Sequence, residues 1–142
     1  MKSSKFWIAV AVGGVVMNIL DYVFQGMIMV NLYYSKHTDV FLDTANPAWF
    51  ILGDFITVIV LAWVYDKVSG SFAAGWKGGA MYGLYAGVLV NFPTWIFLHL
   101  FIKGFSYKYA WFSTVYGIAW TIIAAAIIAA LYKKSETIPA AA

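Results

Sequence analysis

Residues 6–30 read FWIAVAVGGVVMNILDYVFQGMIMV, a largely apolar stretch that carries Asn18, Asp21 and Gln25 in its second half. A helix rises about 1.5 Å per residue, so about 20 residues cross the roughly 30 Å hydrocarbon core of a membrane. Unpaired backbone groups are costly in lipid, and a helix pairs nearly all of its own. The stretch therefore predicts a spanning helix over residues 5–33, too long and too polar for a cleaved signal peptide.

Three further apolar runs follow, separated by short polar segments. They predict helices over residues 48–66, 76–102 and 107–132, with Pro93 interrupting the third of the four. Pro47 suits the first turn of a helix, where a missing N–H costs nothing. The expected fold is all-α: a polytopic membrane protein, a four-transmembrane-helix bundle with short loops. Residues 1–142 form a single transmembrane domain, and residues 133–142 form a short cytoplasmic tail.

The charged residues predict how the helices are oriented. Only 11% of the residues are charged, against about a quarter in soluble domains, which leaves no room for a soluble domain. On the side of the termini lie Lys2, Lys5, Lys67, Lys77, Lys133 and Lys134, and on the other side lie Lys36, Lys103 and Lys108. This excess places both termini in the cytoplasm, in what we expect to be a bacterial inner membrane.

Two absences from the composition exclude classes of site. The chain has no arginine, the residue that usually reads phosphates in two-point contacts, so we expect no nucleic-acid partner. It has no cysteine, which excludes disulfides and thiolate metal sites.

Small residues recur at every fourth position on the third and fourth predicted helices, so each row lies along one face. The rows are Gly75, Gly79, Gly83 and Gly87, followed by Asn91, and Ser113, Gly117, Thr121, Ala125 and Ala129. Small residues let membrane helices approach closely, so we expect the rows to face protein, and each row is a candidate partner for the other. The alternatives are the general abundance of glycine in membrane helices and a groove for a flat ligand such as a pigment, quinone or sterol.

Polar residues inside the apolar runs define the candidate site. On the first helix Asn18, Asp21 and Gln25 fall within an arc of roughly 60° if each residue turns about 100°. The predicted topology brings the polar positions of all four helices into one layer in the outer half of the bundle. The candidates are Asn18, Asp21, Gln25, Asp54, Thr57, Asn91 and Thr114, with Ser113 and Tyr116 at similar depth.

Three interpretations of this layer stay open. The groups can be structural, with protonated aspartates bonding their neighbours, or they can line a ligand or cofactor pocket at the outer mouth of the bundle. The third possibility is a proton or cation path. A path needs polar groups on both sides of the midplane, and residues 59–64 and 122–130 supply almost none.

His99 is the one candidate ligand of a cofactor metal, as an axial ligand of a tetrapyrrole, although an isolated histidine near a helix end is usually interfacial. The sequence requires no cofactor, predicts no metal site and contains no catalytic constellation. Many aromatic residues, Tyr34 and Tyr109 among them, fit the membrane-interface belts. Deeper aromatic residues, which could line a pocket for a flat ligand, are Tyr82, Tyr85, Phe92, Trp95, Tyr116 and Trp120.

The layout resembles small uncharacterised bacterial four-helix membrane proteins. The resemblance lies in the polar stripe running into Gln25–Gly26, the Asp54-bearing second helix and the glycine-rich entry Gly78–Gly83. It implies a four-span bundle and no known reaction.

The sequence predicts a non-enzymatic membrane protein, with lipids and other transmembrane helices (a homo-oligomer or a larger complex) as partners. We expect it to be an accessory or assembly subunit or a small binding protein. Alternatives are a carrier or sensor for a small hydrophobic ligand or pigment, and a proton- or cation-coupled transporter or membrane enzyme using Asp21 and Asp54.

Overall fold

A computed structural model describes residues 3–41 and 46–132, and this part of the chain is helical with no strand. The elements are α1 (Ser4–Asp21), the π-helix η1 (Tyr22–Met29), α2 (Val30–Leu32), η2 (Tyr34–Lys36), α3 (Pro47–Val68), η3 (Ser69–Ser71), α4 (Trp76–Phe101) and α5 (Tyr107–Leu131). Within the described residues, four helical segments are long and apolar enough to cross a membrane, which confirms the predicted all-helical class. The proposed tail, residues 133–142, and residues 42–45 of the first loop lie outside the described part.

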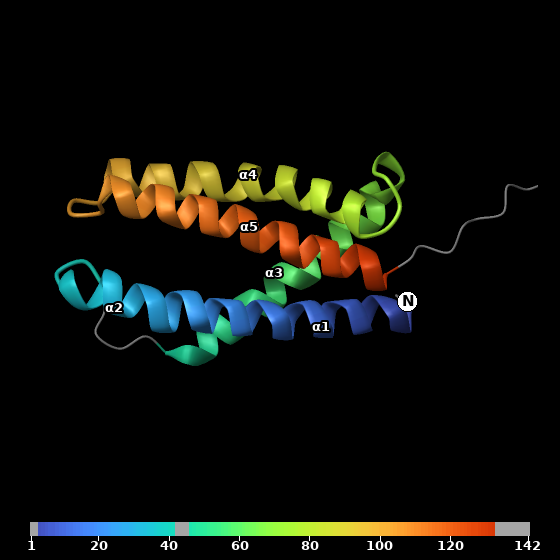
Figure 1. Cartoon of the computed structure of the whole chain (residues 1–142), viewed down its shortest axis with the longest axis horizontal. Coiled ribbons are helices and arrows are strands. Elements are labelled where there is room, and N and C mark those ends of the chain that lie inside the picture. Colours follow the sequence, from blue (N-terminus) through green and yellow to red (C-terminus); the bar gives the residue numbers. More distant parts are fainter. Residues whose placement is uncertain (1–2, 42–45, 133–142) are drawn as a thin grey trace, which may run out of the picture.

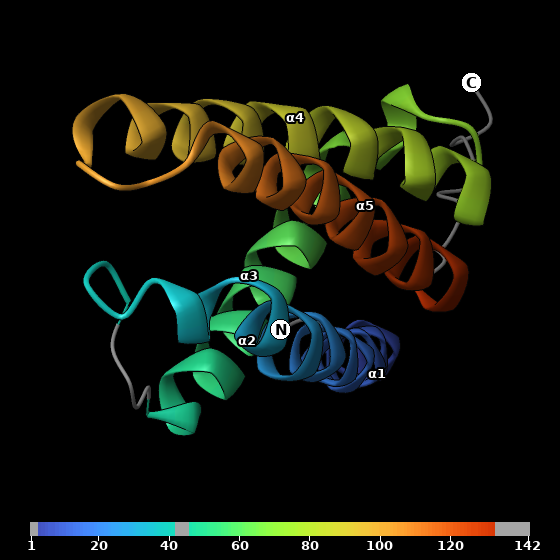
Figure 2. The same ribbon diagram turned by 60° about the vertical axis from the view of Figure 1, so that its left-hand side comes forward.

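The helices form two layers (Figure 1). In one, α4 and α5 lie side by side and run in opposite directions. In the other, α1 and its continuation run along the bundle, while α3 crosses obliquely and joins the layers (Figure 2). The principal contacts of α3 are with α1 and α5, whereas α4 packs mainly on α5. Because α3 leans across the bundle in this way, space is left between it and α4.

Three of the long helices, α1, α3 and α5, begin at a residue whose side chain caps them. Ser3 accepts from the N–H of Phe6, and Ser106 accepts from the N–H of Tyr109. Asn46 caps α3 just before Pro47, which occupies the first turn. These caps place the starts of α3 and α5 within one residue of the positions predicted from sequence.

Pro93 lies inside α4, which continues unbroken to Phe101. The proline removes only one backbone donor, and Pro is tolerated in membrane helices because local adjustments and neighbouring groups satisfy what it frees. The interruption expected at Pro93 therefore does not end the helix.

The two rows of small residues on α4 and α5 lie against each other. A Cβ atom built on Gly79 would lie 2.3 Å from the Ala129 Cβ, and one on Gly83 would lie 2.7 Å from the Ile122 Cα. At Gly87 the corresponding nearest atom, the Ile118 Cα, is at 3.1 Å. The backbones of α4 and α5 approach so closely that these three positions leave little or no room for a side chain.

Three other residues of these rows have different surroundings. Gly75 precedes α4 with a φ of 78° and has no atom within 4 Å of its Cβ position, so its positive φ, not helix packing, accounts for the glycine. Gly117 faces the side chain of Asn91, whose Oδ1 would lie 2.0 Å from a Cβ there. Ser113 is buried and lines a pocket.

Two cores stabilise the two ends of the bundle. At the end that holds Ser3 and Tyr132, the core includes Met17, Val58 and Ile128, all fully buried. The Phe6 and Tyr132 rings meet here at 5.5 Å between centroids, so α1 begins beside the end of α5. At the opposite end, aromatic residues gather around Met29, Phe105 and Tyr109, and the pocket described below lies between these cores.

A hydrogen bond joins the end of α5 to α3. The hydroxyl of Tyr132 donates to Asp66 Oδ1 at 2.6 Å. This bond, with burial and the aspartate charge, raises the pKa of Tyr132 to about 12. The phenol therefore stays protonated, and keeps this bond, well above neutral pH.

Candidate functional site

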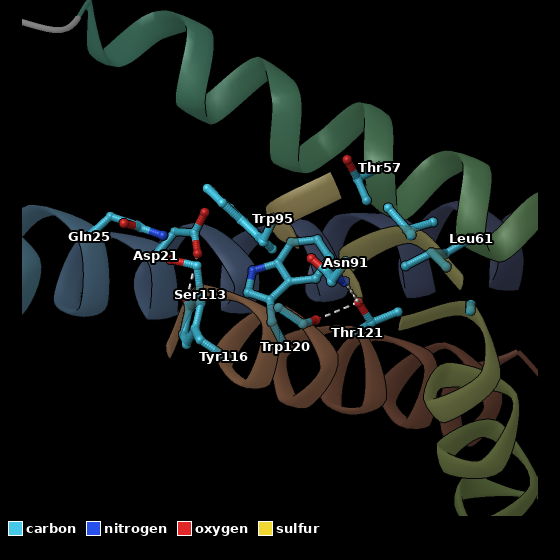
Figure 3. A pocket seen from close by; sticks show the side chains of 13 residues that line it. Asp21, Gln25, Thr57, Leu61, Asn91, Trp95, Ser113, Tyr116, Trp120 and Thr121 are labelled. Carbon is cyan, nitrogen blue, oxygen red and sulfur yellow. Dashed lines mark hydrogen bonds between the residues drawn. The ribbon is translucent and has the colours of Figure 1, made fainter. Parts of the chain in front are cut away.

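A pocket of about 250 Å³ opens among all four long helical segments (Figure 3). Its lining residues are Asp21, Gln25, Thr57, Leu61, Ala86, Val90, Asn91, Trp95, Ser113, Tyr116, Gly117, Trp120 and Thr121. The oblique course of α3 leaves this space. Most of the wall surface is apolar, although six of the thirteen lining residues are polar.

The first span changes from an α-helix to a π-helix between Asp21 and Gln25, the two residues of its polar stripe that line the pocket. α1 ends at Asp21, and the chain continues as a π-helix that contains Gln25. The N–H of Val30 reaches back five residues to the Gln25 carbonyl. π-Helical turns are rare and are frequently found at functional sites. The sequence predicts α-helical spacing from Asn18 to Gln25, and that spacing ends at Asp21. The side chains of Asp21 and Gln25 nevertheless both reach the pocket.

Asp21 is the centre of a polar cluster that joins three helices. Its Oδ1 accepts a hydrogen bond of 2.5 Å from the Tyr116 hydroxyl of α5. Its carboxyl group also neighbours the Asp54 carboxyl of α3, which is only 8% exposed and whose Oδ2 is buried without a hydrogen-bond partner. Two neighbouring buried carboxylates repel each other, which disfavours a negative charge on both groups at once.

Gln25 belongs to a second chain of hydrogen bonds, which leads to the aromatic end of the bundle. The Tyr34 hydroxyl donates to Gln25 Oε1 and lies 2.7 Å from the Tyr109 hydroxyl. Because the single proton of Tyr34 is given to Gln25, Tyr109 must donate to Tyr34. Tyr109 in turn stacks on Tyr33 at 4.6 Å, so this wall of the pocket is anchored to the aromatic core.

Trp120 presents a polar atom without a partner. Its side chain is 9% exposed, and its Nε1 is buried without a hydrogen-bond acceptor. In Figure 3 the indole lies between the Asp21 and Asn91 sides of the pocket, with its nitrogen turned towards the Asp21 side. A buried donor left unpaired costs about 1–3 kcal/mol, so an acceptor in the pocket would be favourable here.

Asn91 forms the opposite side of the pocket. Its Nδ2 donates to the Gly87 carbonyl at 3.0 Å and to Thr121 Oγ1 at 3.4 Å. Together with its contact on Gly117, these bonds hold the amide between α4 and α5. The amide group thus both links the two helices and faces the cavity.

Several sequence candidates are placed elsewhere or bond only to their own helix. Asn18 donates to the Gly14 carbonyl and does not line the pocket, and neither does Thr114, which donates to the Ala110 carbonyl. Thr57 lies at the exposed rim and donates to the Gly53 carbonyl. Such backbone bonds to the preceding turn are a common way for these side chains to be satisfied within a helix.

His99 also lies outside the pocket lining. Its Nδ1 is 2.7 Å from the Phe105 carbonyl, which can only accept, so Nδ1 carries a proton. The histidine thereby ties the end of α4 to the following turn. Within residues 3–41 and 46–132, no group of three or more His, Cys, Asp or Glu side chains could hold a metal ion.

The structure assigns roles that the sequence did not indicate. Tyr34 and Tyr109 were expected in the membrane-interface belt, yet they hold Gln25 through hydrogen bonds. Trp120 was singled out only as a deep aromatic residue, not as an unpaired donor. No local pattern identifies these roles, because each depends on a residue of another helix.

Removing the Tyr116–Asp21 bond should reveal a direct coupling between α5 and α1. In a double-mutant cycle of Tyr116→Phe and Asp21→Ala, measured by denaturant unfolding in micelles, we expect a coupling free energy of about 1–2 kcal/mol. The Tyr82 hydroxyl donates instead to the Leu61 carbonyl, so Tyr82→Phe combined with Asp21→Ala should be additive. Additivity in the Tyr116 cycle as well would contradict the bond.

No family model, no curated protein and no solved structure matches this chain.

Proposed function

We propose that this chain is an integral membrane protein of a bacterial inner membrane, with four spans and both termini in the cytoplasm. It acts as a small binding protein that holds a small amphipathic molecule in the pocket among α1, α3, α4 and α5. No chemical step on the ligand is part of the proposal. The four long apolar helices and the lysines at their ends support the membrane placement.

The observation that carries the binding role is the unpaired Nε1 of Trp120 at the pocket wall. Ligand sites are characteristically concave and mostly apolar, with a few convergent polar groups that orient the ligand. This pocket has that composition, and an acceptor atom on a ligand would satisfy the indole. Its volume is below the usual range of about 300–1,000 Å³ for drug-sized ligands, which favours a small molecule.

The packing between the pocket and the end where the chain begins favours binding of a ligand over conduction of protons or cations. Leu61 and Trp120 belong both to the pocket wall and to the apolar core beyond it. That core continues through Val58, Ala125 and Ile128 to the end where the chain begins. A coupled transporter or an enzyme using the aspartates is therefore the less favoured alternative.

The exposed face of α4 supports a second candidate function, that of an accessory subunit. α4 packs mainly on α5, and large apolar side chains cover its outer face, with Leu89 76% exposed and Phe101 83% exposed. Helices of a larger membrane complex could cover this face as well as lipid does. The mass of the particle in a mild detergent distinguishes a lone chain from an oligomer or a complex.

Filling the pocket tests the binding role. Ala86 lines the pocket, so Ala86→Trp should remove a ligand, whereas Val88→Trp places the same side chain at a 44% exposed position of the same helix. We expect mass spectrometry of solvent extracts to find a small molecule at near-equimolar amount in the parent and Val88→Trp. Ala86→Trp should retain less than about a tenth of it. A parent without such a molecule, or equal amounts in all three proteins, would refute the proposal.

A further inference from the structure

We propose that the ligand is a monovalent organic cation, recognised by the Asp21–Asp54 carboxyl pair and the aromatic walls of the pocket. This inference rests on the binding function proposed above and names its ligand class. It stands on three features: the charge of the pair, the absence of a counter-charge among the lining residues, and the unpaired indole of Trp120.

The ionisable groups at the pocket can supply negative charge, and no lining residue supplies a positive one. Two neighbouring buried carboxyl groups favour ionisation of only one of them, and the Tyr116 hydroxyl donates to Asp21 and so stabilises a negative charge there. None of the residues described as lining the pocket is a lysine, and the chain has no arginine. A buried charge needs a partner, so a single positive charge on a ligand would complement the pair.

The walls favour an organic cation over a metal ion. A hard metal ion requires about six oxygen ligands, whereas Leu61, Ala86 and Val90 contribute only carbon to the pocket. The lining also includes the aromatic rings of Trp95, Tyr116 and Trp120, and the face of such a ring attracts alkylated ammonium groups.

The unpaired Nε1 of Trp120 adds a constraint on the rest of the ligand. The indole can only donate, so it is satisfied by an acceptor such as an ether, hydroxyl or carbonyl oxygen. Its nitrogen is turned towards the Asp21 side of the pocket (Figure 3). The acceptor would therefore lie close to the cationic centre, as in an amino alcohol or an aminoketone.

A pair of probes that differ in charge but not in shape tests the cation. Benzyltrimethylammonium and neopentylbenzene are isosteric, and only the first is charged. We expect the purified protein in detergent to bind the cation at least about tenfold more tightly, as measured by quenching of tryptophan fluorescence and by calorimetry. The double variant Asp21→Asn/Asp54→Asn should remove this preference and still bind neopentylbenzene, whereas each single variant keeps one ionisable carboxyl group and part of the preference.

Acidification should weaken binding of the cation and not of its neutral isostere. A further proton competes with the cation for the carboxyl pair, so the dissociation constant should rise by up to about tenfold per pH unit. The other titratable groups around Asp21 are Tyr34 and Tyr116, and the α4 residues of the pocket lining contribute none. Both phenols are neutral in acid and cannot add to this dependence.

The outcomes separate the two proposals. Equal binding of both probes, or preference for the neutral one, would overturn the cation and leave the binding function standing. If neither probe binds, the cation proposal also fails, and the pocket-filling comparison of Ala86→Trp with Val88→Trp decides on the binding function alone. Loss of the preference in the double aspartate variant, with an unfolding midpoint close to that of the parent, would support the cation, and its persistence there would overturn it.

Discussion

Gly83→Leu is expected to weaken the pairing of α4 with α5 and to lower the free energy of unfolding by about 3 kcal/mol. A Cβ at this position would lie 2.7 Å from both the Ile122 Cα and the Thr121 carbonyl oxygen, atoms of the α5 backbone that cannot rotate away. Overpacking of a close contact typically costs about 1–3 kcal/mol, and a backbone clash belongs at the upper end. Unfolding in micelles, followed by tryptophan fluorescence, measures the loss.

The chain offers a matched control for this substitution. Gly53 lies within α3 and has no atom within 4 Å of its Cβ position, so Gly53→Leu should change the unfolding free energy by less than about 0.5 kcal/mol. The comparison separates contact with α5 from the general effect of replacing glycine in a helix. If Gly83→Leu is as stable as Gly53→Leu, the α4 and α5 backbones do not approach each other closely at Gly83.

Gly14→Leu should weaken the contact between α1 and α3 by about 1–3 kcal/mol, because a Cβ there would lie 2.3 Å from two atoms of the Phe55 ring. The obstacle is a side chain, so the clash can be removed from the other helix. In the Phe55→Ala background, Gly14→Leu should cost little or be stabilising. The same unfolding titration, applied to the four proteins of this cycle, measures the rescue.

Gly26 is the control on the same span, since its nearest atoms belong to its own neighbour Tyr22, at 3.5 Å and beyond. Gly26→Leu should therefore be tolerated with or without Phe55. A cost of Gly14→Leu that is the same in both backgrounds would show that Phe55 is not the obstacle and that α3 does not cross α1 there.

The helices could be predicted from sequence because hydropathy and helix caps are local properties. Pro47 predicts the start of α3, and in the structure the side chains of Asn46 and Ser106, each next to its helix in the chain, cap α3 and α5. The positions of small residues could also be read from their spacing. Their partners could not, since the spacing on α4 does not say which helix fills the groove.

The candidate site could be predicted only in part. Asp21, Gln25, Thr57 and Asn91 line one pocket, and Asp54 neighbours Asp21 without lining that pocket. Asn18 and Thr114 lie at similar depth but bond to their own helices, because depth does not determine which way a side chain faces. The π-helix after Asp21 also changes the direction in which the following side chains face, and no local sequence pattern predicts it.

The sequence by itself determined the number of long apolar helices, their order and their ends, because each depends on residues that are neighbours in the chain. Only the tertiary structure decided the oblique course of α3, the pocket that it leaves beside α4, and the unpaired indole of Trp120. These depend on how helices rotate and cross. Rotation and crossing are set jointly by contacts such as Gly14 on Phe55 and Gly83 on Ile122, between residues far apart in sequence.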